Sequence, residues 1–228
     1  MLNALRPAFT RLLTPVGVAL ARTPITPNMI TVAGTVGVSA SALSMFPIGY
    51  LFPGAATCTL FVFTDMLDGV LARLKGTSGT WGAFLDSTMD RVGDASVFSG
   101  LVIWFMLGGH NALLAGVTLF CLVSGLLVSY VKARAEGLGM RADVGIVERP
   151  ERLIIGLTSV GLNGLGVPYV LVFGLWGLAI ASAFTLGQRM RAVYQAAAAK
   201  TAATEPAGQA PAQGPAAQAS GTNSQTDG

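Results

Sequence analysis

The feature that most limits the fold of this chain is a series of six long apolar runs, which cover residues 28–46, 50–73, 82–108, 112–134, 148–165 and 168–189. A helix needs roughly 20 apolar residues to cross a bilayer, and most of these runs reach that length. Only 11% of the 228 residues are charged, against about 25% in a soluble domain. The sequence therefore predicts an all-α integral membrane protein with six transmembrane helices.

The positions of Lys and Arg predict the orientation of these helices. The connectors 47–49, 108–111 and 163–168 contain neither residue. Every Lys and Arg lies in the N-terminal arm, in or next to the connectors that follow the second and fourth runs, or after the sixth run. Because cytoplasmic segments are enriched in these residues, we expect both termini to be cytoplasmic. We expect a multi-pass protein of the cell membrane.

Two flanking segments differ from the apolar runs. In residues 1–22, Leu and Phe recur near helical spacing while Arg6 and Arg11 lie elsewhere on the helix, which predicts an amphipathic helix at the membrane surface. A frayed terminus is the alternative. Residues 196–228 are rich in Ala, Gln, Pro, Gly and Ser, and we expect them to form a disordered tail. Residues 23–195 then form the six-span domain.

Four aspartates lie where the second apolar run ends and the third begins. Asp65 and Asp68 are spaced i, i+3, and Asp86 and Asp90 are spaced i, i+4, so each pair lies on one face of a helix. A turn between the two runs would bring the pairs together. Crowded carboxylates repel one another unless a cation lies among them, and their oxygens suit Mg²⁺, Mn²⁺ or Ca²⁺. The sequence predicts a divalent-metal site, for two ions, at the cytoplasmic edge of the membrane.

The residues around these acids suit phosphoryl transfer, because two metal ions can clamp a phosphoryl group. Gly69 and Ala72 lack bulk and would let a ligand approach the backbone closely. Arg73 suits a phosphate, and Asp90 is the candidate to take a proton from an attacking hydroxyl. In the alternative, Arg73 and Arg91 form structural salt bridges with the acids, which would account for only one or two of them.

The residues from Asp65 to Asp90 match the pattern D-x2-D-G-x2-A-R-x8-G-x3-D-x3-D at every fixed position. This pattern resembles the signature of the CDP-alcohol phosphotransferases. The resemblance implies a CDP-linked lipid donor, a hydroxyl acceptor, release of CMP and a homodimer. It also implies that Asp90 is the general base and that two Mg²⁺ ions, with Mn²⁺ as an alternative, are held by Asp65, Asp68, Asp86 and Asp90.

The same resemblance locates the site for the donor, CDP-diacylglycerol. Residues 28–31 resemble the donor-contacting stretch of the family, and the glycine, alanine and arginine of the motif would line the cytidine diphosphate site. The spacer between the motif halves contains Thr77, Ser78 and Thr80, whose hydroxyls suit a phosphate or ribose. The donor-binding candidates are Asn28, Met29, Ile30, Thr31, Gly69, Ala72, Arg73 and Ser78.

A second group of cations lies at the predicted cytoplasmic ends of the fourth, fifth and sixth spans. A charge within the end of an apolar span is costly, so Lys132, Arg152 and Arg189 are expected to form an anion pocket beside the metal site. The alternative is that they anchor lipid headgroups. The segments S-Y-V-K-A-R-A-E and E-R-P-E-R-L resemble the bacterial branch of the family whose acceptor is inositol 1-phosphate. This implies an acceptor-phosphate site formed by Ser129, Lys132, Arg152 and Arg189.

The predicted reaction is direct transfer of the phosphatidyl group to a hydroxyl of inositol 1-phosphate, and two other functions stay open. Glycerol 3-phosphate would suit the same motif and an equally anionic pocket. A divalent-cation transporter would need polar groups along a path to the far side, and the outer halves of the spans carry no charge. We expect Asp94, one turn beyond Asp90, to be a structural partner of Arg91 or a further ligand. The expected partners are the two substrates and membrane lipids, with no nucleic acid.

Overall fold

The computed structural model describes residues 6–77 and 79–204, with side chains for residues 14–64, 66–77 and 79–200. All regular structure in these ranges is helical, which confirms the all-α prediction for the described part of the chain. The seven helices are α1 (Arg6–Ala21), α2 (Pro27–Met45), α3 (Leu51–Lys75), α4 (Thr80–Leu107), α5 (Ala112–Gly137), α6 (Arg149–Gly164) and α7 (Val170–Thr204).

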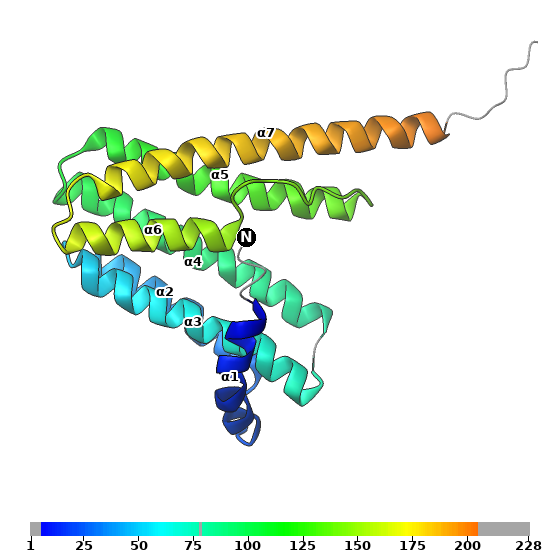
Figure 1. The fold of residues 1–228 in the computed structure, drawn as a ribbon, viewed down its shortest axis with the longest axis horizontal. Coiled ribbons are helices and arrows are strands. Elements are labelled where there is room, and N and C mark those ends of the chain that lie inside the picture. Colours follow the sequence, from blue (N-terminus) through cyan, green and yellow to red (C-terminus); the bar gives the residue numbers. More distant parts are fainter. Residues whose placement is uncertain (1–5, 78, 205–228) are drawn as a thin grey trace, which may run out of the picture.

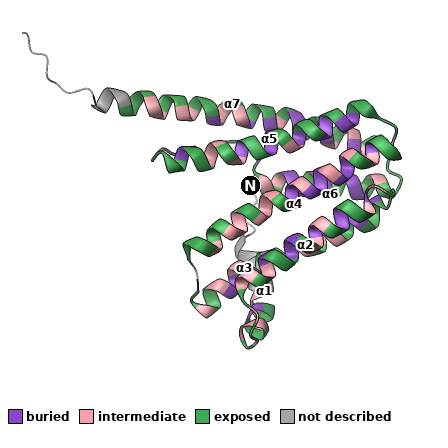
Figure 2. Cartoon of the chain, turned by 180° about the vertical axis from the view of Figure 1, so that it is seen from behind, coloured by how far each residue is buried: buried purple, intermediate pink, exposed green. Residues whose placement is uncertain are grey.

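Helices α2 to α7 form a closed ring. Around it, α2 packs against α3, α3 against α6, α6 against α7, α7 against α5, α5 against α4, and α4 against α2. The inward faces are buried (Figure 2), and the core includes the fully buried Phe46, Leu101 and Leu175. The ring places α3 and α4, which carry the motif acids, beside α6 and α5, which carry most of the predicted anion pocket.

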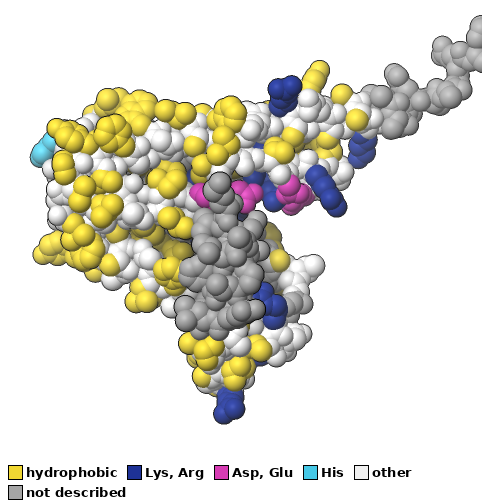
Figure 3. Space-filling model, in the orientation of Figure 1, with side chains coloured by type: hydrophobic (Ala, Val, Ile, Leu, Met, Phe, Trp, Pro, Cys, Tyr) yellow, Lys and Arg dark blue, Asp and Glu magenta, His cyan; other side chains and the backbone are white. Residues whose placement is uncertain are grey.

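The connectors gather at two opposite ends of the ring. The α2–α3, α4–α5 and α6–α7 turns lie together at one end, and the α3–α4 and α5–α6 connectors lie toward the other (Figure 1). On the face shown in Figure 3, Lys and Arg lie on the half toward the second end, whereas His110 lies at the first. The fold thus separates the uncharged turns from the basic connectors, as the sequence predicts.

Four of the described helices are long and apolar enough to cross a membrane: Pro27–Met45, Leu51–Lys75, Ala112–Gly137 and Val170–Lys200. Their outer faces expose large apolar side chains, among them Leu60, Phe173 and Ile180, as expected for a surface in contact with lipid. Helix α6 is shorter, with 16 residues, and α4 carries the charged residues of the motif. The chain is a multi-pass membrane protein.

The start of α2 and the end of α3 follow the local sequence. Thr26 caps α2 by accepting a hydrogen bond from the Met29 amide at 3.3 Å, and Pro27 occupies the first turn, where its missing N–H costs nothing. Helix α3 ends at Lys75 and is capped by Gly76, whose φ of 63° is in the left-handed region that favours glycine. These two boundaries determine where the motif residues of α3 lie relative to the first turn of α2.

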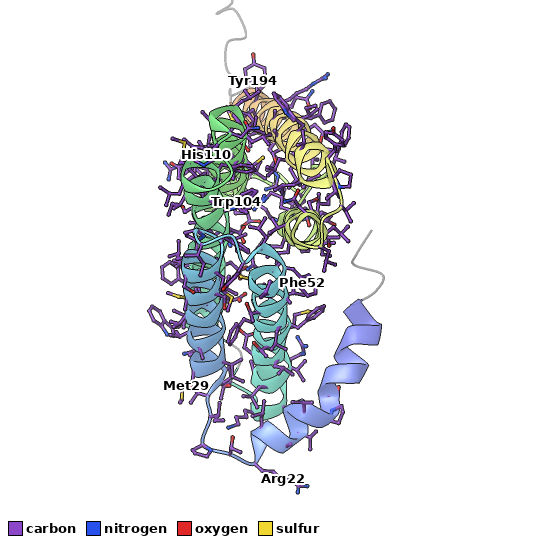
Figure 4. All side chains as sticks on the ribbon, turned by 90° about the vertical axis from the view of Figure 1, so that its left-hand side faces the viewer. Arg22, Met29, Phe52, Trp104, His110 and Tyr194 are labelled. Atoms are coloured by element: carbon purple, nitrogen blue, oxygen red, sulfur yellow. The ribbon has the colours of Figure 1, made fainter. Side chains whose placement is uncertain are left out.

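Helix α1 stands outside the ring, as Figure 4 shows when the bundle is viewed from the His110 end, and it packs against α3. The connector between α1 and α2 is tied to α3 by Lys75, whose Nζ donates hydrogen bonds to the carbonyls of Thr23 and Ile25 at 2.9 and 2.8 Å. The predicted amphipathic face falls mainly on side chains outside the described ones.

The last helix is longer than the sequence predicted. We expected the sixth span to end near Arg189 and a disordered tail to begin at residue 196, but α7 continues to Thr204. Residues 196–199 are a run of four alanines, the residue with the highest helix propensity, which favours continuing the helix. The rest of the predicted tail, residues 205–228, lies outside the described residues.

Helices α2 and α4 approach closely at Gly100. A Cβ atom built on Gly100 would lie 2.5 Å from the Ala42 carbonyl oxygen, and backbone atoms cannot move aside as a side chain can. We therefore expect Gly100→Ala to lower the free energy of unfolding by roughly 1–3 kcal/mol, measured as a lower melting temperature in detergent. Gly116→Ala is the matched control, because a Cβ on this helical glycine meets no atom within 4 Å. Equal melting temperatures for the two variants would contradict the close approach.

Candidate active site

The two halves of the aspartate motif come from consecutive helices of the chain. Asp65 and Asp68 lie in the last turns of α3, and Asp86 and Asp90 in the first turns of α4. The carboxylates of Asp68 and Asp86 interact electrostatically, and so do those of Asp86 and Asp90. The side chain of Asp65 is not among the described ones, and within those no three acidic, His or Cys groups meet at metal-binding distance. The fold thus brings three of the four predicted ligands near one another.

Two of these carboxylates already have polar partners. Thr31 donates a hydrogen bond from Oγ1 to Asp68 Oδ2. Asp90 Oδ1 lies 2.8 Å from Arg149 Nη1, and Asp90 Oδ2 lies 3.8 Å from Arg91 Nη1. Thr31, which was predicted to bind CDP-diacylglycerol, therefore lies against a predicted metal ligand. A cation entering this site would replace these polar partners or bind beside them.

The other residues predicted to bind CDP-diacylglycerol lie around the first turn of α2 and the motif segments of α3 and α4. The Asn28 side-chain oxygen is 3.7 Å from the position of a Cβ on Gly82, so the first turn of α2 lies beside the motif glycine of α4. Arg73 is exposed, and its Nη1 is 3.8 Å from the position of a Cβ on Gly69, so this side chain runs back along α3. Met29 is exposed, Ile30 and Ala72 are half-buried, and Ser78 lies outside the described residues.

Each of the three cationic side chains that were predicted to bind the acceptor phosphate is paired with a carboxylate of this chain. Lys132 Nζ lies 2.6 Å from Asp143 Oδ1. Arg152 Nη2 lies 3.1 Å from Asp94 Oδ2, and Arg189 Nη2 lies 3.5 Å from Glu148 Oε1. The fourth candidate, Ser129, donates from Oγ to the Gly125 carbonyl of its own helix at 3.2 Å. An acceptor phosphate would therefore replace or join carboxylates that already neutralise these cations.

The pair formed by Lys132 and Asp143 is at the surface and joins the end of α5 to the connector that follows it. A hydrogen bond from Lys132, together with its positive charge, holds the pKa of Asp143 below the usual range. A lowered carboxyl pKa means that the pair is present at neutral pH and is lost only as the pH falls through that pKa. Asp143 is thus ionised, and able to pair with Lys132, throughout the physiological range.

Arg189 has a structural role that the sequence did not reveal. It is 3% exposed and donates from Nε to the Val144 carbonyl at 2.9 Å and from Nη1 to the Val128 carbonyl at 2.7 Å. One turn earlier, Thr185 Oγ1 accepts hydrogen bonds from two further amides of the same connector. Arg189 thus fastens the α5–α6 connector to α5 and α7, while its charge still interacts with that of Arg152.

Sequence reasoning missed Arg149 and paired Asp94 with the wrong arginine. Asp94 does not pair with Arg91 of its own helix: its Oδ1 is 3.2 Å from Arg149 Nε, and its Oδ2 pairs with Arg152. The available signal was the E-R-P-E-R segment, which places Arg149 and Arg152 at i, i+3 on one face of α6. That face is directed toward Asp90 and Asp94 on α4.

Comparison with known proteins identifies the family. Residues 24–187 match the family model for CDP-alcohol phosphatidyltransferase. The chain belongs to this family. A phosphatidylinositol phosphate synthase of Streptomyces avermitilis is 46% identical over 206 residues, which cover 87% of this chain and 84% of the relative. The enzyme of that name from Mycolicibacterium smegmatis is 47% identical over 191 residues, covering 82% of this chain and 86% of the relative.

Solved structures of one CDP-alcohol phosphatidyltransferase share the fold. A crystal structure of Mycobacterium tuberculosis phosphatidylinositol phosphate synthase with CDP-DAG bound superposes with a TM-score of 0.78 at 44% identity, covering 81% of this chain and 94% of that one. A second structure of that enzyme, in complex with manganese and citrate, gives a TM-score of 0.77 at 44% identity, covering 80% of this chain and 88% of that one.

The aspartate motif of this chain is chemically suited to bind a divalent cation. The groups that α3 and α4 present are carboxylate oxygens, the donors that hard divalent ions prefer. Asp68 and Asp90 each have one oxygen bonded to Thr31 or Arg149, and a carboxylate oxygen has more than one lone pair with which to bind a cation. We therefore treat the motif as a divalent-metal site.

Proposed function

We propose that this enzyme transfers the phosphatidyl group of CDP-diacylglycerol to a hydroxyl of inositol 1-phosphate, giving phosphatidylinositol phosphate and CMP. The observation that carries the proposal is the position of Arg152, which shares the Asp94 carboxylate with Arg149, the partner of Asp90. An acceptor whose phosphate binds Arg152 would have its hydroxyl near the motif acids. The names of the S. avermitilis and M. smegmatis relatives support the same acceptor.

In the membrane, all six helices of the ring span the bilayer and both termini are cytoplasmic. This topology is supported by the separation of uncharged turns from basic connectors at opposite ends (Figures 1 and 3). Helix α6, with its 16 residues, is about 24 Å long, and local thinning of the bilayer accommodates a helix that is shorter than the hydrocarbon core. The active site then lies at the cytoplasmic face of the cell membrane. A homodimer stays a prediction from the family resemblance.

The motif acids Asp65, Asp68, Asp86 and Asp90 would hold two Mg²⁺ ions, with Mn²⁺ as an alternative. When bound, such ions neutralise the diphosphate of the donor. Asp90 takes the proton from the acceptor hydroxyl, whose oxygen forms a bond to the phosphorus that carries diacylglycerol. The bond from that phosphorus to the bridging oxygen breaks, and CMP leaves. Donor contacts come from Asn28, Met29, Ile30, Gly69, Ala72, Arg73 and Ser78, and Thr31 acts through Asp68.

Product identification tests this function. Purified protein in detergent is given CDP-diacylglycerol, Mg²⁺ and one of three acceptors: inositol 1-phosphate, glycerol 3-phosphate or free inositol. We expect phosphatidylinositol phosphate from the first acceptor and little product from the others, measured by mass spectrometry of the lipid extract. Phosphatidylglycerophosphate as the main product would overturn the choice of acceptor. Efficient use of free inositol would contradict the proposal that an anion pocket binds the phosphate of the acceptor.

The pair formed by Asp143 and Lys132 leads to a prediction about acceptor affinity. If this carboxylate competes with the acceptor phosphate for Lys132, Asp143→Asn should lower the acceptor KM by roughly twofold to fivefold, the range for one exposed ion pair. The measurement is the initial rate against inositol 1-phosphate concentration. Glu136→Gln is the control, since Glu136 faces the same Lys132 at 4.0 Å, and we expect it to change the KM less. A raised KM in Asp143→Asn would mean that Asp143 orients Lys132 for the acceptor.

A further inference from the structure

Asp94 is a buried carboxylate whose two oxygens bind two different arginines. It lies on α4 one turn after Asp90, and its side chain is 8% exposed. Oδ1 accepts from Arg149 Nε at 3.2 Å, and Oδ2 accepts from Arg152 Nη2 at 3.1 Å. Both arginines come from the first turn of α6. One side chain of α4 therefore holds both cations of α6, which faces α4 across the ring.

Arg152 reaches Asp94 past a point where a glycine of α5 leaves room for it. Its side chain is 4% exposed and crosses Gly125 of α5, where a Cβ atom would lie 3.1 Å from Arg152 Nε and 3.2 Å from its Cζ. The guanidinium group thus lies against the backbone of α5. Its lateral position is set by the glycine, and the position of its tip is set by Asp94.

Arg149 continues the arrangement toward the motif. Its Nη1 is 2.8 Å from Asp90 Oδ1 while its Nε is bonded to Asp94. Arg152, Asp94, Arg149 and Asp90 therefore alternate in charge and together carry no net formal charge. In a poorly solvated site, removing one member leaves an uncompensated charge and frees the orientation of its neighbours.

We propose that Asp94 is a positioning residue that couples the two halves of the active site. Through Arg149 it orients Asp90, the group that takes the hydroxyl proton, and through Arg152 it determines where the acceptor phosphate sits. The distance between these two points then selects acceptors by the separation of their reacting hydroxyl from their phosphate. This inference rests on the proposed function for the identity of the acceptor.

The test is a kinetic comparison of Asp94→Asn with the wild type. Asparagine keeps the shape of the side chain, but its amide nitrogen would face one of the two guanidinium groups. We expect kcat to fall and the acceptor KM to rise, each by roughly tenfold, the effect of a charged hydrogen bond, with the donor KM nearly unchanged. Asp94→Glu restores the charge but displaces both arginines, so the preference for inositol 1-phosphate over glycerol 3-phosphate should weaken.

Phe98→Leu is the control for a merely structural role. Phe98 is buried one turn after Asp94 and lines the same small crevice as Asp94 and Arg152. This substitution should lower the melting temperature without changing the acceptor KM. If Phe98→Leu reproduces the kinetic changes of Asp94→Asn at an equal loss of melting temperature, Asp94 is structural only and the proposal fails.

Gly125→Ala keeps the proposal testable if Asp94→Asn does not fold. The added methyl group must push the Arg152 guanidinium aside by a few tenths of an ångström while leaving Asp94 in place. We expect a raised acceptor KM, a smaller thermal shift on adding inositol 1-phosphate without donor, and a nearly unchanged donor KM. An unchanged acceptor KM would overturn the proposal.

Failure of the proposed function can be distinguished from failure of this inference. If the wild type uses glycerol 3-phosphate instead of inositol 1-phosphate, the proposed function fails, and the same kinetic comparison with glycerol 3-phosphate as acceptor still tests the role of Asp94.

Discussion

Asp90→Asn should reduce phosphatidyl transfer by roughly two to four orders of magnitude, the usual contribution of a general base. Asparagine cannot take the proton of the attacking hydroxyl. The neighbouring carboxylate of Asp94 is already engaged by two arginines and cannot replace it. Asparagine retains one oxygen toward the metal site, so we expect binding of the donor to survive largely. The measurements are CMP release at saturating substrates and binding of CDP-diacylglycerol to the purified variant.

Thr88→Ala is the matched control for Asp90→Asn. Thr88 is exposed on the same helix, and its hydroxyl donates to the Phe84 carbonyl of that helix. We expect near wild-type turnover from this variant. Near wild-type turnover in Asp90→Asn itself would show that Asp90 is not the base. Loss of both turnover and donor binding would instead identify Asp90 chiefly as a ligand.

Arg152→Ala should both raise the acceptor KM and destabilise the protein. Removing one partner of a buried ion pair costs about 3–5 kcal/mol, because the other charge is left poorly compensated, and Arg152 and Asp94 are 4% and 8% exposed. The acceptor also loses a charged hydrogen bond, which is worth roughly a tenfold or greater change in KM. The measurements are the melting temperature in detergent and the rate against inositol 1-phosphate concentration.

The double variant Arg152→Ala with Asp94→Ala separates these two effects. Removing both charges should recover part of the melting temperature, since the uncompensated carboxylate is gone, but the acceptor KM should stay high. Arg191→Ala is the control, because Arg191 is exposed on α7 and we expect it to affect neither quantity much. A double variant with a wild-type acceptor KM would show that Arg152 does not contact the acceptor.

The sequence predicted the helices, and most of their ends, because these depend on residues a few positions apart. The apolar runs, the Thr26–Pro27 start of α2 and the spacing of the motif acids are all local patterns. The error at the end of α7 has a local cause too, since we took the alanine run that begins at residue 196 as part of a low-complexity tail rather than as a strong helix former.

The partners of the charged residues were mostly not predictable from the sequence. Asp94 and Arg152 are 58 positions apart, and Arg189 and Val144 are 45 apart. Any of several arginines would have satisfied Asp94 on sequence grounds, and we expected it either to partner Arg91 or to be a further ligand. Only the tertiary arrangement, in which α4 and α6 face each other across the ring, decides which charges meet.

By itself, the sequence determined that this chain is helical, lies in a membrane and presents two pairs of aspartates from consecutive helices. The tertiary structure alone decided that Asp94 bridges Arg149 and Arg152, and that Arg189 fastens a connector as well as carrying a charge. The physical reason is that helix formation is governed by neighbours along the chain, whereas the pairing of a buried charge depends on which helix packs against it.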